Sequence, residues 1–169
     1  MGGMGSGNWW RWQEKKATVE ESLVVAMKDL RKRMFGGAAG TLTWTWNSGG
    51  KSSIGFYVTG SADWPTVNLH YRWRDKEDVN IPVPLEATPT QFGGRRWWFV
   101  CPLIVRGIAC NRRAGKLYLP PRAKYFGCRT CHDLTYRSCQ EAHQTERVFG
   151  RLGFDAEVAK MWEHMHRRK

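Results

Sequence analysis

Residues 41–46 read Thr-Leu-Thr-Trp-Thr-Trp, with a large apolar side chain at every second position, and three further alternating segments follow. These segments cover residues 54–58, 67–73 and 79–85, and short polar turns separate them. Successive side chains of a strand point to opposite faces, so this period of two predicts strands with one buried and one solvated face. Four such strands with short connections predict an antiparallel β-meander.

Two prolines lie between the apolar positions of the last predicted strand. Pro82 and Pro84 have no amide hydrogen to donate to a neighbouring strand. Proline is therefore found in sheets mainly on edge strands. We predict that residues 79–85 form an edge of the sheet.

A helix is predicted before the meander, over residues 18–34. Thr18 and Glu21 have the spacing of a capping box, in which each side chain binds a backbone amide at the helix start. Apolar residues then recur at helical spacing: Val19, Leu23, Val24, Met27, Leu30 and Met34. We expect this apolar stripe to pack on the apolar face of the meander. That face presents Trp44, Phe56 and Leu69.

The length of 169 residues predicts one domain, or one domain with a small appended module. Hydrophobic residues make up 41% of the chain, which is enough to build a core and excludes global disorder. No apolar run approaches the roughly 20 residues of a spanning helix, and the start of the chain lacks the pattern of a signal peptide. We therefore expect a soluble cytoplasmic protein that does not contact a membrane.

Charge is distributed unevenly along the chain. Residues 1–94 carry 11 basic and 9 acidic side chains, whereas residues 95–169 carry 16 basic and 6 acidic ones. Nearly all of the net charge of +12 therefore lies in the second half. A positive field attracts phosphate polymers, anionic membranes or acidic proteins, and the charge alone does not choose among them.

All five cysteines lie in the second half of the chain. Without a secretory signal, an odd number of cysteines favours thiolates that bind a metal over a disulfide framework. Cys128 and Cys131 are separated by two residues, the spacing of a tight metal-binding turn. Cys101 and Cys110 are separated by eight residues, which is wider than the usual two to four.

Short strands are expected around these cysteines, at residues 97–100, 116–119 and 124–127. Two cysteine-bearing turns joined by short strands predict a zinc ribbon, with one structural Zn²⁺ held by four thiolates. A composition shift at residues 91–94 suggests three parts of the chain. We expect a helix and sheet over 1–94, the zinc ribbon over 95–137 and a C-terminal helical segment over 138–169. The predicted fold class is thus α+β: an N-terminal helix packed on an antiparallel meander, then a four-cysteine ribbon and C-terminal helices.

Other ligand sets remain open. Cys139 and His143 lie one helical turn apart and could complete a site with Cys128 and Cys131. Iron bound by four thiolates is chemically possible, although no second cofactor signature accompanies it. A catalytic zinc is disfavoured, because it needs an open coordination position and usually mixed ligands. We expect Cys139 to be a free thiol.

The cysteines lie within longer blocks of characteristic sequence. Residues 93–102 read Gly-Gly-Arg-Arg-Trp-Trp-Phe-Val-Cys-Pro, residues 110–113 read Cys-Asn-Arg-Arg, and residues 125–131 read Tyr-Phe-Gly-Cys-Arg-Thr-Cys. With the N-terminal segment Gly5-Ser-Gly-Asn-Trp9-Trp-Arg-Trp12, these blocks resemble an uncharacterised family of small bacterial and prophage zinc-ribbon proteins. The resemblance covers most of residues 5–145. It implies that the four ribbon cysteines bind the metal, and it supplies no activity and no catalytic residue.

Basic residues of the second half flank the metal turns and alternate with aromatic ones. Cations can neutralise phosphates while aromatic faces stack on unpaired bases, so we predict a non-enzymatic protein that binds DNA or RNA. The candidate contacts are Arg95, Arg96, Arg112, Arg113, Lys116, Arg122, Lys124, Arg129 and Arg137. In the competing interpretation, the aromatic residues fill the ribbon's core and the arginines keep it soluble.

Two other functions are weighed against nucleic-acid binding. A prophage-type interaction protein could inhibit or scaffold a larger nucleic-acid-processing complex, with Trp9, Trp10 and Trp12 contacting the protein partner. A nuclease or other hydrolase could use the polar residues after the last ribbon cysteine, namely His132, Asp133, Glu141 and His143. Nothing in the sequence fixes a general base or an open metal position, so we expect no enzymatic activity.

The C-terminal segment predicts a short amphipathic helix. Asp155 can cap its start, and Val158, Trp162 and Met165 share one face. A helix this short is barely stable alone. We therefore expect it to dock on the ribbon, on a partner protein or on a second copy of the chain.

Overall fold

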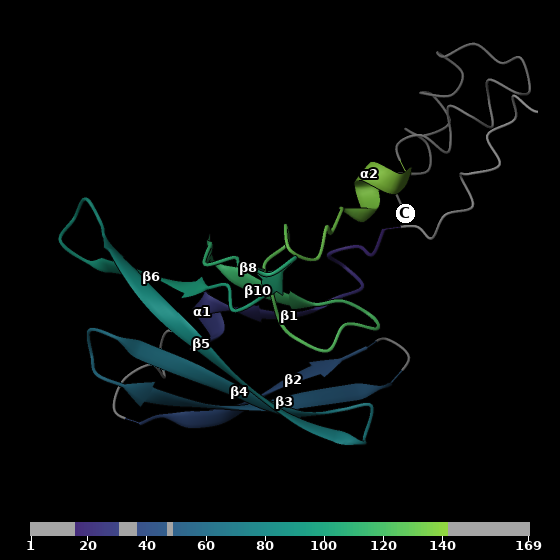
Figure 1. Ribbon diagram of the computed structural model, residues 1–169, viewed down its shortest axis with the longest axis horizontal. Coiled ribbons are helices and arrows are strands. Elements are labelled where there is room, and N and C mark those ends of the chain that lie inside the picture. The colour runs from purple at the N-terminus through teal and green to yellow at the C-terminus, as the bar shows by residue number, and fades with distance from the viewer. Residues whose placement is uncertain (1–15, 31–36, 47–48, 142–169) are drawn as a thin grey trace, which may run out of the picture.

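The computed structural model describes residues 16–30, 37–46 and 49–141. Its main element is a six-stranded antiparallel sheet in the order β2-β3-β4-β5-β6-β9 (Figure 1). The strands of this sheet are β2 (Ala39–Thr45), β3 (Lys51–Gly60), β4 (Pro65–Trp73), β5 (Glu77–Pro89), β6 (Arg95–Val100) and β9 (Arg113–Ala114). The remaining elements are β1 (Leu23–Ala26), α1 (Met27–Leu30), β7 (Ile104–Val105), β8 (Ile108–Ala109), β10 (Lys116–Leu119) and α2 (Arg137–Glu141).

The predicted meander is confirmed by strands β2 to β5, each of which pairs with the next in antiparallel register. The alternation seen in the sequence matches the burial of the side chains. Val67 and Leu69 of β4 are fully buried, and they lie opposite the buried Val83 and Ile81 of β5. One face of the sheet is therefore apolar and faces the core.

The prediction that residues 79–85 form a sheet edge is confirmed for residues 79–84, which pair with β4 alone, and is wrong for β5 as a whole. β5 extends to Pro89, and its last five residues, from Leu85 onward, pair with β6 on the side opposite β4. Pro82 and Pro84 lie in the earlier part of β5, where the only strand pairing is with β4. The missing amide hydrogens are therefore tolerated because pairing with β6 begins after the prolines.

The predicted helix over residues 18–34 is also wrong in the part that the structure describes. Residues 23–26 form β1, which pairs antiparallel with β10, and helix α1 contains only four residues. The Thr18 amide does donate to Glu21 Oε2 at 3.2 Å, as in a capping box, but Thr18 also bridges Thr135 in the second half of the chain. The β-branched pair at residues 24–25 favours a strand once β10 supplies a partner.

The core lies between the sheet and a second layer formed by β1, α1 and β10 (Figure 1). Leu117 from β10 and Phe126 from the loop after it are fully buried in the same cluster as Phe56 and Leu69 from the sheet. Val25 of β1 and Met27 and Leu30 of α1 also join this cluster, so the segment expected to cover the meander does so as a strand followed by a short helix. The predicted α+β class is wrong, because strands dominate and the two described helices have four and five residues.

The turn after β5 joins the two halves of the chain. The Thr90 amide donates to the Gly94 carbonyl at 2.8 Å, and the sheet continues through it into β6 and β9. The predicted C-terminal helix, with Val158, Trp162 and Met165, lies outside the described residues. Within the described part of the chain, no helix has the length and apolar character needed to cross a membrane.

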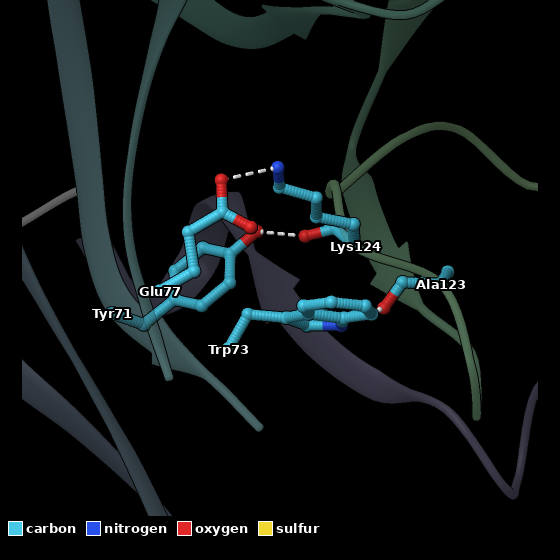
Figure 2. A network of polar contacts seen from close by, with 5 residues as sticks. All are labelled: Tyr71, Trp73, Glu77, Ala123 and Lys124. Atoms are coloured by element: carbon cyan, nitrogen blue, oxygen red, sulfur yellow. Dashed lines mark hydrogen bonds and ion pairs between the residues drawn. The ribbon is translucent and has the colours of Figure 1, made fainter. Parts of the chain in front are cut away.

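A polar network fixes the loop that precedes the second cysteine pair to the sheet (Figure 2). The Tyr71 hydroxyl donates to the Lys124 carbonyl, and the Trp73 Nε1–H donates to the Ala123 carbonyl at 3.0 Å. The Lys124 ammonium lies 2.6 Å from Glu77 Oε1. Burial, and next the neighbouring phenol of Tyr125, raises the pKa of Tyr71, so its hydroxyl stays protonated and able to donate.

Candidate metal centre

Four cysteine sulfurs form one compact cluster, with Cys101 directly after β6 and Cys110 directly after β8. The ligand atoms of Cys101, Cys110, Cys128 and Cys131 all lie within 4.8 Å of one another. The Sγ atoms of Cys101 and Cys131 are 3.8 Å apart, and those of Cys110 and Cys128 are 3.9 Å apart. All four thiols are free of disulfides. These four cysteines could therefore hold a metal ion.

The eight-residue gap of the first cysteine pair is a β-hairpin. Strands β7 and β8 pair within it, and Arg106 and Gly107 at its tip have φ angles of 53° and 79°. Two consecutive residues with positive φ are typical of the type I′ turn of a two-residue hairpin. At the base, the Cys110 amide donates to the Leu103 carbonyl at 2.9 Å. The hairpin thus returns Cys110 to a position opposite Leu103, which follows Cys101 by two residues.

The second cysteine pair is positioned by β10. Gly127 exchanges two backbone hydrogen bonds with Tyr118, at 2.8 and 3.0 Å. The strand predicted over residues 124–127 is reduced to this single bridge, because the preceding loop bends away toward the sheet. The Cys128 amide then donates to Cys101 Sγ at 3.3 Å, which links the two half-sites directly.

The ionisation of the four thiols depends on their burial and on their closeness to one another. Burial raises the pKa of the Cys101 and Cys131 thiols. Burial acts in the same direction at Cys110, but hydrogen bonds from the Arg112 amide and from the other thiols leave its pKa lowered. Asn111, with a φ of 48°, bends the chain between Cys110 and that amide. Four thiolates this close repel one another, so all four ionise together only with a positive ion between them.

The polar residues after Cys131 do not join the cluster. His132 is half-buried, burial lowers its pKa, and its Nε2 atom has no hydrogen-bond partner among the described residues. Asp133 is exposed and forms an ion pair with Lys16 at 2.6 Å. The hydrolase candidates His132 and Asp133 are therefore not gathered with the cysteines into one metal-binding group in the described chain. The side chain of Glu141 lies outside the part that the structure describes.

The alternative ligand set is not assembled in the described part of the chain. Cys139 is exposed on α2 and is not a member of the described cluster. His143 lies outside the described residues, as do Trp9, Trp10 and Trp12, the candidate partner contacts.

The nine predicted nucleic-acid contacts differ in what their side chains already contact. Three of them are engaged in ion pairs with acidic residues of the first half, namely Arg95 with Asp63, Arg113 with Glu86 and Lys124 with Glu77. Two have their guanidinium groups over aromatic rings, Arg96 over Trp98 at 4.1 Å and Arg129 over Tyr136 at 5.2 Å. The other four, Arg112, Lys116, Arg122 and Arg137, have exposed side chains.

Comparison with protein-family models, with curated proteins and with solved structures gives no match for this chain. The resemblance to a prophage zinc-ribbon family therefore stays a prediction. The chemistry of the site has to be inferred from the residues that form it.

Sequence reasoning missed the hairpin that closes the first half-site. A usable signal is present, because Arg106-Gly107 is flanked by Ile-Val on one side and Ile-Ala on the other. Apolar pairs around a central dipeptide ending in glycine indicate a tight hairpin. With the hairpin recognised, the wide spacing of Cys101 and Cys110 is an ordinary metal turn that carries an insertion.

Gly127→Ala is expected to lower both the metal affinity and the stability of the protein. An added Cβ would lie 2.1 Å from Leu103 Cδ1 and 3.0 Å from His132 Nε2, next to both half-sites. Overpacking of this kind costs about 1–3 kcal/mol in unfolding free energy. Chemical denaturation of the metal-bound protein measures the change.

The matched control is Gly115→Ala, whose added Cβ would make ordinary contact with Trp98 at 3.7 Å. We expect this variant to unfold within about 0.5 kcal/mol of the wild type. Equal stability of the two variants would contradict the proposed crowding at Gly127.

Proposed function

We propose that this chain is a cytoplasmic zinc-ribbon protein that binds nucleic acid and catalyses no reaction. The metal holds the ribbon together, and the basic surface of the second half contacts phosphates. The two parts of the proposal rest on different observations.

The donor set supports zinc as the metal. A tetrahedral zinc site with Zn–S distances of about 2.3 Å has sulfur atoms about 3.8 Å apart. Two of the sulfur pairs here are separated by 3.8 and 3.9 Å. Four cysteines without a water position are typical of structural zinc sites, and a reducing compartment keeps the thiols available.

The observation that carries nucleic-acid binding is the exposed charge of residues 95–141. This segment has ten basic residues and two acidic ones, and nine of the ten basic side chains are exposed. Six of them form no ion pair among the described residues: Arg96, Arg106, Arg112, Lys116, Arg129 and Arg137. A surface with this excess of cations attracts a polyanion, and neutralised phosphates release counterions.

The competing interpretation, that the aromatic residues only fill the core, applies to some of the aromatic residues in the second half of the chain. Trp97, Tyr118 and Phe126 are buried. Tyr125 and Tyr136 are each 43% exposed, and basic side chains lie over both rings. These two tyrosines keep an accessible edge next to a cation, which supports contacts with unpaired bases.

A second function, docking to a protein of a nucleic-acid-processing complex, is favoured by the β7–β8 hairpin. Ile104 and Ile108 are 69% and 74% exposed, and Val105 beside them is 42% exposed. Large apolar side chains that protrude together often mark a protein interface. This hairpin projects from the metal centre, so a partner bound there would sense whether the metal is present.

Titration of the metal-bound full chain with a labelled oligonucleotide at several salt concentrations tests the proposal. We expect the logarithm of the binding constant to fall linearly with the logarithm of the salt concentration, because phosphate contacts release counterions. A polyglutamate peptide of equal charge should bind more weakly, since it offers no bases. No binding to any oligonucleotide would contradict the proposal. A protein that stays bound after nuclease treatment and is lost in Ile104→Ser would favour the second function.

A further inference from the structure

A groove with a volume of about 630 Å³ lies beside the junction of the sheet and the second layer. Three separate segments line it: the end of β1 with the start of α1, the turn and strand of β6, and the start of β10. Its four charged lining residues are all basic, namely Lys28, Arg95, Arg96 and Lys116. We call this feature the basic groove.

Arg96 is held in place within the basic groove. Its guanidinium lies 4.1 Å from the centre of the Trp98 ring. That ring is itself fixed, because its Nε1–H donates to Thr88 Oγ1 at 2.9 Å and Gly115 lies close to its six-membered edge. A guanidinium stacked on an aromatic ring keeps its N–H groups free for two parallel hydrogen bonds to a phosphate.

The other cations differ in how available they are. Lys28 and Lys116 are exposed and form no ion pair among the described residues. Arg95 is paired with Asp63 at 3.0 Å, so its charge is already partly balanced. The lining therefore offers three cations, Lys28, Arg96 and Lys116, that an anionic ligand can neutralise.

Two strongly exposed aromatic residues are adjacent in sequence to residues of the basic groove or to their ion-pair partner. Phe92 is 96% exposed and lies in the turn between Thr90 and Arg95, both of which line the groove. Trp64 is 76% exposed and follows Asp63, the ion-pair partner of Arg95. Neither ring contributes to the core, whereas an exposed ring can stack on an unpaired base.

We propose that the basic groove binds single-stranded nucleic acid, with phosphates on Lys28, Arg96 and Lys116 and bases stacked on Phe92 and Trp64. This inference rests on the proposed nucleic-acid function and names its site and its form of ligand. The volume lies in the range of small-molecule pockets, which suits one or two nucleotides of a single strand. The bases of a duplex are stacked on one another and leave no face for the two aromatic rings.

The test compares three ligands on the zinc-bound full chain: a single-stranded oligonucleotide, a duplex of the same sequence and a nucleoside triphosphate. Binding is followed by fluorescence anisotropy for the two labelled oligonucleotides and by competition for the triphosphate. We expect the single strand to bind at least tenfold more tightly than the other two. The proposal would be overturned if the duplex bound as tightly as the single strand. It would also be overturned if the triphosphate bound as tightly as the single strand.

The matched variants remove equal charge inside and outside the lining of the basic groove. Arg96→Gln with Lys116→Gln should weaken single-strand binding about tenfold or more and lower the salt slope by about 2. Lys51→Gln with Lys76→Gln, exposed residues at the β2–β3 and β4–β5 turns, should change binding less than threefold. Phe92→Ala should weaken binding about tenfold without a change in melting temperature, because the ring is exposed.

The outcomes separate this inference from the proposed function. If the chain binds nucleic acid with a clear salt dependence but both double variants lose affinity equally, the basic groove is not the site and the general function stands. If the wild-type chain binds no nucleic acid, both the basic groove proposal and the proposed function fail. Thermal melting of each variant with zinc bound excludes loss of fold as the cause.

Discussion

Cys128→Ser is expected to release the metal and to unfold the second layer of the protein. Cys128 lies within the sulfur cluster and also donates its amide to Cys101 Sγ, so it links the two half-sites. Structural zinc binding contributes about 10–16 kcal/mol in zinc-finger peptides, and one missing thiolate removes much of that energy. Elemental analysis and near-ultraviolet circular dichroism of the purified variant measure both effects.

Cys139→Ser is the control for this substitution, because Cys139 is exposed and is not a member of the cluster. We expect it to retain one metal ion per chain and the wild-type spectrum. Full metal loss in Cys139→Ser would instead indicate the ligand set that includes His143. A full metal complement in Cys128→Ser would contradict the four-cysteine site.

Phe126→Ala is expected to lower the unfolding free energy by about 3–5 kcal/mol. The Phe126 side chain is fully buried and meets the Tyr71 ring edge-on, with the ring centres 5.5 Å apart. It joins the loop before Cys128 to the sheet, so its removal leaves a cavity between the layers. Denaturant titration of the zinc-bound protein, followed by tryptophan fluorescence, measures the loss.

Tyr125→Ala tests the same loop one residue earlier, where the ring is 43% exposed. We expect it to cost less than about 1 kcal/mol, because little apolar area leaves the core. A similar loss in both variants would mean that the loop, rather than the buried ring, determines stability.

The sequence predicts the meander correctly because its signal is local. Alternating side chains such as Val67, Leu69 and Tyr71 determine both the strand and its buried face. The prediction for residues 18–30 fails because Leu23, Val24 and Met27 fit a helical period, although they belong to a strand and a short helix. The deciding partner, β10, lies in the second half of the chain, and no local pattern shows that pairing.

The cysteines of the candidate site could be identified from the sequence, and the basic groove could not. Cys128 and Cys131 have a metal-turn spacing that is visible in four residues. Lys28 lies in the segment predicted as a helix, and only the contact between the two layers brings it beside Arg96. Charge counts identify a basic half of the chain, but the shape of its surface depends on tertiary packing.

The pairing of β1 with β10 has a consequence for biosynthesis. β1 leaves the ribosome long before β10, Cys128 and Cys131 are translated. Its Leu23-Val24-Val25 segment is therefore without its strand partner during that time. An unpaired apolar strand is prone to pair with other nascent chains, and contacts distant in sequence form slowly. Closure of the second layer therefore comes late in synthesis. If the four cysteines hold zinc as proposed, the zinc supply at that moment should affect how much of the newly made protein escapes aggregation.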